Sequence, residues 1–277
     1  MRKISLNYRE PLHDVRSTRR LEQIAASALS PHALMARAGE ALANLTEALA
    51  PHAQTLWVAC GPGNNGGDGL VAATLLHNRV QERGLNRRIC LTLAGDPDKL
   101  PPDAGNALRN ALASGLTPAS HPPSNHDFAI DALLGIGATR EPEGNLARLL
   151  SQLRSSHSPV LAVDVPSGLM ADTGVLLGEA ATPTAARHTL SLLTLKPGLF
   201  TGHGRDAAGD IWFDDLGVGP GTPVPHTALL YAPMPDKAHL ARRHASHKGS
   251  YGDVLVIGGQ GLSINGVAMC GAALLAA

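Results

Sequence analysis

Short apolar runs alternate with amphipathic segments between residues 54 and 213. Six runs have the length and composition of buried strands, and the segments between several of them have apolar residues at helical spacing. The expected strands are residues 54–60, 88–94, 127–134, 160–165, 188–195 and 210–213, and the expected helices between them are residues 69–83, 103–114 and 144–155. Strands that are apolar throughout and alternate with helices predict an α/β fold with a mostly parallel sheet covered on both faces.

Two amphipathic helices are expected ahead of the first strand. Apolar residues from Leu21 to Leu29 fall on one helical stripe, and a second stripe extends from Leu34 to Leu49. Pro31 separates the two because proline cannot continue a helix. Their exposed stripes are compatible with packing between subunits, so a homodimer is one interpretation.

The composition changes after residue 213. Residues 217–235 are rich in proline and glycine, which is typical of a linker or an irregular closing segment. A new strand is then expected at residues 253–257, followed by a glycine turn and an apolar helix from residue 265. One strand and part of a helix cannot bury their own apolar faces. We therefore expect the residues after about 245 to be poorly ordered or only docked on the first domain.

Composition and charge exclude several classes of protein. Lysine plus arginine and aspartate plus glutamate each number 23, which argues against a nucleic-acid binder or a polybasic membrane protein. The polar N-terminus lacks a signal-peptide pattern, and no apolar run reaches the roughly 18 residues of a membrane span. The widely spaced Cys60, Cys90 and Cys270 favour reduced thiols and a cytoplasmic location.

The first expected strand ends in a glycine-rich loop, residues 61–69. Gly61, Gly63 and Gly66 match the GxGxxG pattern of dinucleotide-binding loops. However, Asp68 would repel a pyrophosphate held in this loop. Asp96 also lies too far beyond Gly66 for a ribose contact, which is expected at roughly 20 residues. The amides of Asn64 and Asn65 instead favour a polar ligand or a hard cation.

Polar residues also follow the third and fourth expected strands. Asp131 lies in an apolar run, and Asp164 and Ser167 follow the next strand. A flexible loop after Asp131 contains Arg140, a candidate phosphate ligand. The carboxyl ends of parallel strands meet at one edge, where ligands bind. Oxygen donors from Asn65, Asp131 and Ser167 at that edge indicate a weakly bound hard cation.

Four motifs together resemble one known family. They are GPGNNGGDGLVAA at 61–73, DALLGIG at 131–137, DVPSG at 164–168 and LTLKPGLFTGHGRDAAGDI at 193–211. The segment LMARAGEAL at 34–42 adds to the likeness. The chain thus resembles the NAD(P)H-hydrate (NAD(P)HX) epimerase domain, the N-terminal domain of the bifunctional NAD(P)H-hydrate repair enzyme. The resemblance covers roughly residues 15–220.

The resemblance implies a Rossmann-like three-layer α/β/α sandwich and a bound potassium ion. Asn65, Asp131 and Ser167 match the potassium ligands of the family. The substrate-binding positions it implies are Asn64, Asn65, Gly66, Gly67, Asp68, Gly135, Ile136, Gly137, Ala138, Thr139, Arg140, Glu141 and Asp164. The implied reaction interconverts the S and R forms of NAD(P)HX at C6 of the nicotinamide ring, which is a metabolite repair reaction.

Such a reaction needs a proton-transfer group, because C6 is a carbinolamine carbon that loses and regains its oxygen or undergoes ring opening. We take Asp131 as that group and Asp164 as a residue that fixes the substrate. Two alternatives remain open at this point, an NAD(P)-dependent oxidoreductase that uses the same glycine loop and a non-catalytic nucleotide-binding module.

The resemblance also implies a domain organisation. We expect an epimerase domain at residues 1–220, a linker at 221–245, and at 246–277 the start of a ribokinase-like, ADP-dependent NAD(P)H-hydrate dehydratase domain. The nucleotide loop and catalytic residues of that second domain are not within these residues, so no dehydratase activity is expected. The expected partner is the small-molecule substrate NADHX or NADPHX, with no nucleic acid and no membrane.

Overall fold

The computed structural model describes residues 1–5, 9–178, 188–219 and 224–231. Its centre is a seven-stranded sheet with the strand order β1-β8-β7-β6-β5-β3-β4. The strands are β1 (Arg2–Lys3), β3 (Thr55–Cys60), β4 (Arg88–Leu93), β5 (Phe128–Ala132), β6 (Val160–Val163), β7 (His188–Leu192) and β8 (Asp210–Asp214). All neighbouring pairs are parallel except β1 with β8, so the prediction of a mostly parallel sheet is confirmed.

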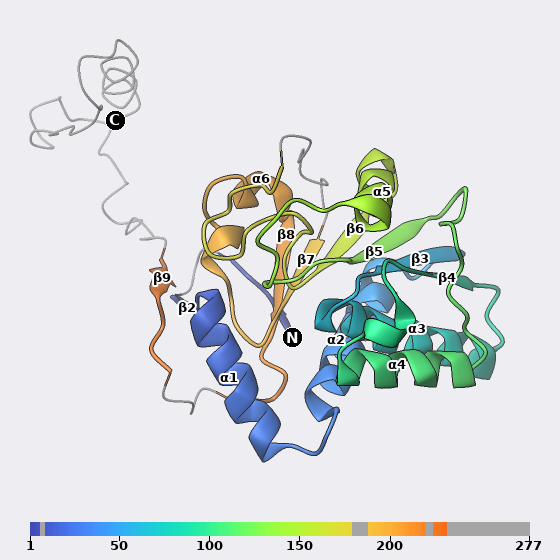
Figure 1. Cartoon of the computed structure of the whole chain (residues 1–277), viewed down its shortest axis with the longest axis horizontal. Coiled ribbons are helices and arrows are strands. Elements are labelled where there is room, and N and C mark those ends of the chain that lie inside the picture. Colours follow the sequence, from blue (N-terminus) through green and yellow to red (C-terminus); the bar gives the residue numbers. More distant parts are fainter. Residues whose placement is uncertain (6–8, 179–187, 220–223, 232–277) are drawn as a thin grey trace, which may run out of the picture. The chain divides into compact units, whose positions relative to one another are not determined.

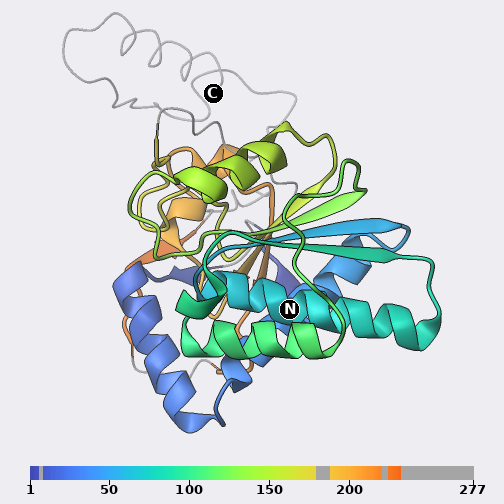
Figure 2. The same cartoon turned by 45° about the vertical axis from the view of Figure 1, so that its right-hand side comes forward.

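Helices cover both faces of this sheet. The helices α2 (Ala33–Leu49), α3 (Asn64–Arg83) and α4 (Pro102–Ala113) lie together on one face, and α5 (Gly144–Ser155) lies on the other (Figures 1 and 2). Alternate residues of a strand point to opposite faces. Accordingly, Val58 of β3 belongs to the aliphatic core under α2–α4, whereas Trp57 belongs to the core under α5. The predicted three-layer α/β/α arrangement is confirmed.

Smaller elements complete the first domain. The helix α1 (Val15–Ala28) is capped at its N-terminus by Asp14, whose side chain accepts a hydrogen bond from the Ser17 amide at 2.7 Å. A buried hydrogen bond of 2.8 Å joins Thr18 of α1 to Thr194, which follows β7. The remaining elements are β2 (Glu10–Leu12), η1 (Pro97–Lys99), η2 (Pro197–Leu199), α6 (Gly204–Ala207) and β9 (Ala228–Leu230).

The glycine-rich segment differs from its prediction. The sequence predicts a loop over residues 61–69 and a helix from residue 69, but α3 already begins at Asn64. Glycine is a poor helix former, which is why the sequence pattern suggests a loop. Close packing overrides that preference, because a Cβ atom on Gly66 would lie 2.0 Å from the carbonyl oxygen of Gly61. The glycines allow the first turns of α3 to lie directly against the end of β3.

The first compact unit of the chain comprises Met1–Ala232. It includes β9, which pairs with β2 and lies in the segment 221–245 that the sequence predicts as a linker. The expected dehydratase start at 246–277, its predicted order and Cys270 lie outside the described residues. The division into domains and the homodimer stay predictions. Of the helices that the structure describes, none is both long and apolar enough to cross a membrane.

Candidate functional site

A cavity of about 590 Å³ lies at the carboxyl edge of the parallel strands. Its walls come from the first turns of α3, the loop between β5 and α5, the residue after β6, and α1. The predicted substrate-binding residues that line it are Asn64, Asn65, Asp68, Gly135, Ile136, Gly137, Ala138, Thr139, Arg140, Glu141 and Asp164. Gly66 and Gly67 are buried in α3 and are not among its lining residues. The structure therefore brings together three motifs that are far apart in the sequence.

Asn64 and Asn65 form the first turn of α3 and line the cavity. A helix N-terminus presents unpaired N–H groups and favours anionic or polar ligands. The Asn65 amide lies against the loop after β5, since a Cβ atom on Gly135 would lie 3.1 Å from Asn65 Oδ1. Within the described part of the chain, the buried Asn65 Nδ2 has no hydrogen-bond partner. This amide therefore retains an unused polar group beside the cavity.

Asp131 lies beneath the cavity and not in its wall. It is the fourth residue of β5, and its side chain is fully buried. Its Oδ1 accepts hydrogen bonds from Ser167 Oγ at 2.6 Å and from the Leu133 amide at 3.2 Å, and its Oδ2 accepts one from the Ser167 amide at 3.0 Å. Burial raises the pKa of Asp131, whereas these hydrogen bonds and the charge of Arg154 act in the opposite direction.

The burial of Asp131 bears on its predicted roles. A proton-transfer group must reach the substrate directly or through one water molecule. Asp131 does not line the cavity, so this geometry favours the predicted cation-site role over proton transfer. Ser167, the second predicted ligand, is hydrogen-bonded to Asp131, and its Oγ also accepts from the Leu134 amide at 2.8 Å. Asn65 lies against Gly135, the next residue in that loop.

Asp164 lines the cavity and has an unusual backbone conformation. It follows β6 with a φ of 68°, in the left-handed region that residues other than glycine rarely adopt. Its Oδ1 accepts hydrogen bonds from Lys196 Nζ and, at 3.2 Å, from the Leu192 amide. Lys196 is fully buried. The cavity thus contains one carboxylate with a buried cationic partner.

Asp68 and Glu22 line the same cavity, and neither forms a salt bridge within the residues that the structure describes. Burial raises the pKa of Asp68 well above its ordinary value, and the nearby charges of Asp164 and Glu22 add to the effect. The pKa of Glu22 on α1 is also raised, first by burial and then by the charge of Asp164. Carboxyl groups in this environment favour the protonated form. The cavity therefore combines a carboxylate that contacts a buried lysine with carboxyl groups suited to donate protons.

The basic side chains that line the cavity are Arg19 of α1 and Arg140 of the loop before α5. Arg19 reaches that loop, since a Cβ atom on Gly137 would lie 3.3 Å from Arg19 Nη2. In the part of the chain that the structure describes, neither guanidinium forms an ion pair. Both are thus available to an anionic ligand.

Comparisons with known proteins place the chain in a family. A family model described as YjeF-related protein N-terminus matches residues 31–198. The NAD(P)H-hydrate epimerase of Bordetella pertussis strain CS is 38% identical over 207 residues, which are 73% of this chain and 88% of that relative. The bifunctional NAD(P)H-hydrate repair enzyme Nnr of Escherichia coli K12 is 37% identical over 267 residues, which are 94% of this chain and 50% of that relative.

The family model covers more than half of the chain, and the B. pertussis relative is matched over most of its own length. The chain belongs to the YjeF-related N-terminal family. The family predicted from the sequence motifs is thereby confirmed. The crystal structure of yeast ynu0, YNL200c, shares the fold with a TM-score of 0.59 at 18% identity, over 69% of this chain and 84% of that one. The chain spans about half the length of the E. coli relative.

The sequence analysis did not single out Arg19, Glu22 or Lys196, which lie in or next to this cavity. Arg19 and Glu22 lie outside the segment that the family model matches, and nothing in their helix pattern shows that α1 lies beside the cavity. Lys196 carries a signal that was available, because it is the one charged residue in the apolar run from Leu190 to Phe200. A charged group in such a run is expected to be paired.

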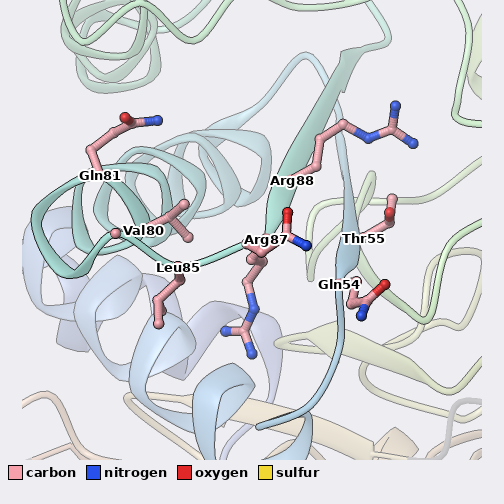
Figure 3. Close-up of a pocket in the computed structure, with 9 residues that line it drawn as sticks. Gln54, Thr55, Val80, Gln81, Leu85, Arg87 and Arg88 are labelled. Atoms are coloured by element: carbon pink, nitrogen blue, oxygen red, sulfur yellow. The ribbon is translucent and has the colours of Figure 1, made fainter.

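A second cavity, of about 340 Å³, lies at the opposite edge of the sheet, near the start of β3 and β4 (Figure 3). One of its lining residues, Arg87, has a structural role. The guanidinium of Arg87 donates hydrogen bonds to the carbonyl oxygens of Ala50, Pro51 and Ala53, next to the C-terminus of α2. A cation at a helix C-terminus stabilises the unpaired carbonyl groups there. Arg87 therefore has a structural role at the end of α2.

Proposed function

We propose that this protein interconverts the S and R forms of NAD(P)HX at C6 of the nicotinamide ring. One observation carries the proposal: the polar residues of three separate family motifs line a single cavity together with ionised and protonatable carboxyl groups. The names of the relatives from B. pertussis and E. coli support the same activity.

The charges in the cavity suggest how the substrate is oriented. NAD(P)HX carries a pyrophosphate at one end and the hydrated nicotinamide ring at the other. We place the phosphates toward Arg19 and Arg140, because guanidinium groups bind phosphate oxygens in pairs. The ring then lies toward Asp68 and Asp164, where the carboxyl groups gather.

Epimerisation at C6 requires proton transfer in both directions. A protonated carboxyl group donates its proton to the C6 hydroxyl, which leaves as water while the ring nitrogen forms a double bond to C6. Water then adds to the other face of C6 and returns a proton to the carboxylate, so no net oxidation or reduction occurs. Asp68 has the raised pKa that suits a general acid, and it lines the cavity. We therefore transfer to Asp68 the proton-transfer role first predicted for Asp131.

The residues predicted to bind potassium fit a monovalent cation. The buried Asn65 Nδ2 has no hydrogen-bond partner among the residues that the structure describes, and a 180° flip of the amide places its oxygen at that position. Asp131 supplies a buried negative charge, and Ser167 holds its carboxylate oxygens in place. Among the described residues, no three His, Cys, Asp or Glu side chains are placed to bind a metal ion, so amide and hydroxyl oxygens would be needed. A bound potassium ion would neutralise Asp131 and order the loop after β5.

A direct epimer assay tests the proposed function. Purified S and R hydrates of NADH and NADPH are incubated separately with the protein, and the epimers are separated by chromatography in potassium and in choline salts. We expect each epimer to be converted to the same mixture, faster in potassium, with no change in redox state. Conversion to oxidised or reduced nicotinamide would instead support the oxidoreductase alternative. Binding without conversion would support the non-catalytic module.

An Asp131→Asn variant separates the two roles considered for that residue. We expect it to lose the potassium dependence of the rate, because the buried negative charge is removed. Full epimerisation with an unchanged potassium response would contradict the cation-site role.

A further inference from the structure

Lys196 is a fully buried lysine that the proposed reaction does not yet use. It follows β7, and its Nζ donates hydrogen bonds to Asp164 Oδ1, to the carbonyl oxygen of Leu192 at 2.7 Å and to Ser191 Oγ at 3.4 Å. An ammonium group has three protons to donate, so these acceptors use all of them. A buried charge persists only when it is paired and hydrogen-bonded. In the part of the chain that the structure describes, the ion pair of Lys196 is with Asp164.

The two oxygens of Asp164 have different environments. Oδ1 accepts from Lys196 Nζ and from the Leu192 amide. No hydrogen bond to Oδ2 is found within the described residues, although Asp164 lines the cavity and its side chain is 13% exposed. One oxygen is therefore held by the protein, and the other remains for a ligand.

The backbone of Asp164 is held by the same segment of the chain as its side chain. Its left-handed conformation persists only where the surroundings impose it. The Asp164 amide donates to the carbonyl oxygen of Leu190 at 2.7 Å, so both its backbone and its side chain are attached to β7 and the segment after it. Lys196 lies on that segment and supplies the charge that completes the attachment.

We infer that Lys196 is a positioning residue for the epimerisation. Its ammonium group pairs with Asp164 and, together with the Leu192 amide, fixes Oδ1, so that Oδ2 is presented to the substrate in one orientation. This inference rests on the proposed function, and it adds a residue that does not itself line the cavity. Displacement of a substrate-orienting group by a fraction of an ångström to one ångström is enough to slow an enzyme strongly.

A double-mutant cycle tests the inference, with Lys196→Met, Asp164→Asn and the double variant compared with the wild type. We expect Lys196→Met to lower kcat/KM by about 100-fold, the loss that misplacement of an orienting group produces. In the Asp164→Asn background the same substitution should cost less than about twofold, because the carboxylate on which Lys196 acts is absent. A purely structural role would give the same loss in both backgrounds, and that result would overturn the inference.

Two further variants distinguish a loss of positioning from a loss of folding. Lys196→Arg retains a cation and should keep at least about ten times the kcat/KM of Lys196→Met, whereas equal activities of the two would count against the inference. Lys99→Met is the matched control, since Lys99 forms a surface ion pair with Asp96 and should keep the wild-type rate. If Lys196→Met does not fold, Lys196→Arg replaces it in both backgrounds of the cycle, and an equal loss of kcat/KM in the wild-type and Asp164→Asn backgrounds would again overturn the inference.

The outcomes for the wild type keep the two proposals distinguishable. If the wild type does not interconvert the epimers, the proposed function fails and this inference fails with it. If the wild type is active and the losses in the cycle multiply, only the role of Lys196 is overturned.

Discussion

Ser167 holds both carboxylate oxygens of Asp131, with its hydroxyl 2.6 Å from Oδ1 and its amide nitrogen 3.0 Å from Oδ2. The two residues lie 36 positions apart in the chain, at the ends of neighbouring parallel strands. This contact joins the DALLGIG and DVPSG segments beneath the cavity. It also accounts for a buried acidic residue near the end of an otherwise apolar strand.

Substitution of Ser167 tests how much this contact stabilises the fold. Ser167→Ala removes a donor to Asp131 and an acceptor for the Leu134 amide, which leaves buried polar groups unpartnered. We expect the free energy of unfolding to fall by about 2 kcal/mol, measured by urea denaturation. Ser114→Ala, which removes an exposed hydroxyl that donates to the Asn110 carbonyl, should change it by less than about 0.5 kcal/mol. Equal effects of the two substitutions would show that the Ser167–Asp131 contact stabilises the fold no more than an exposed hydrogen bond does.

The raised pKa of Asp68 predicts a pH-dependent gain in stability on its removal. A carboxyl group whose pKa is raised in the folded state stabilises the fold at pH values below its unfolded pKa, and this contribution is lost as the pH rises through the folded pKa. Asp68→Asn removes the ionisation, so the variant should be more stable than the wild type at alkaline pH. We expect a Tm higher by about 2–4 °C there, with the difference shrinking toward acid pH.

Calorimetry across the pH range checks this prediction, and Asp98→Asn serves as its control. Asp98 is exposed, so its substitution should leave a Tm difference that does not grow with pH. A constant Tm difference for Asp68→Asn would argue against an elevated pKa at that position. In the epimer assay the same variant should lose most of its activity, because it lacks the proposed general acid.

We predict that Arg19 of α1 contributes to substrate binding. Arg19→Gln removes a cation from the cavity, and we expect KM for the hydrated dinucleotide to rise about tenfold, which corresponds to one charge-assisted hydrogen bond. The value of kcat should change less, because the phosphates are remote from C6. The measurement is the initial epimerisation rate at several salt concentrations.

The neighbouring Arg20 provides the control for that experiment. Arg20 is exposed on the same helix and is not a lining residue of the cavity. Arg20→Gln should therefore leave KM within about twofold of the wild type. If both substitutions raise KM equally, the effect is one of overall charge and the phosphate contact assigned to Arg19 is wrong.

We predict that no side chain larger than that of glycine fits at position 66, in the first turn of α3. A Cβ atom there would lie 2.0 Å from the Gly61 carbonyl oxygen, and the Gly61 amide is itself hydrogen-bonded to Ala132 at 2.9 Å. Gly66→Ala should lower the free energy of unfolding by about 3 kcal/mol, because backbone must move. Gly63→Ala is the matched control, since no atom lies within 4 Å of its added Cβ. Wild-type stability of Gly66→Ala would mean that α3 begins further from β3 than the structure places it.

Much of this protein follows from the sequence alone. Apolar runs and helical spacing predict the six longer strands and the helices α2, α4 and α5 to within a few residues. These elements are predictable because their apolar residues must be buried whatever surrounds them. The GNNGGDG and DVPSG segments identify the family without a structure, and they contribute Gly63, Asn64, Asn65, Asp68 and Asp164 to the lining of the cavity.

Only the tertiary structure decides how the site is divided among these residues. It places Asp131 beneath the cavity, pairs Asp164 with Lys196, and brings Arg19 and Glu22 of α1 to the cavity wall. Neither hydrophobic spacing nor motif recognition contains this information, because whether a carboxyl group is buried, paired or exposed depends on groups that are distant in the chain. The sequence thus determines which polar groups gather at the edge of the sheet, and the packing of β7 and α1 determines which of them are ionised, protonated or available to a ligand.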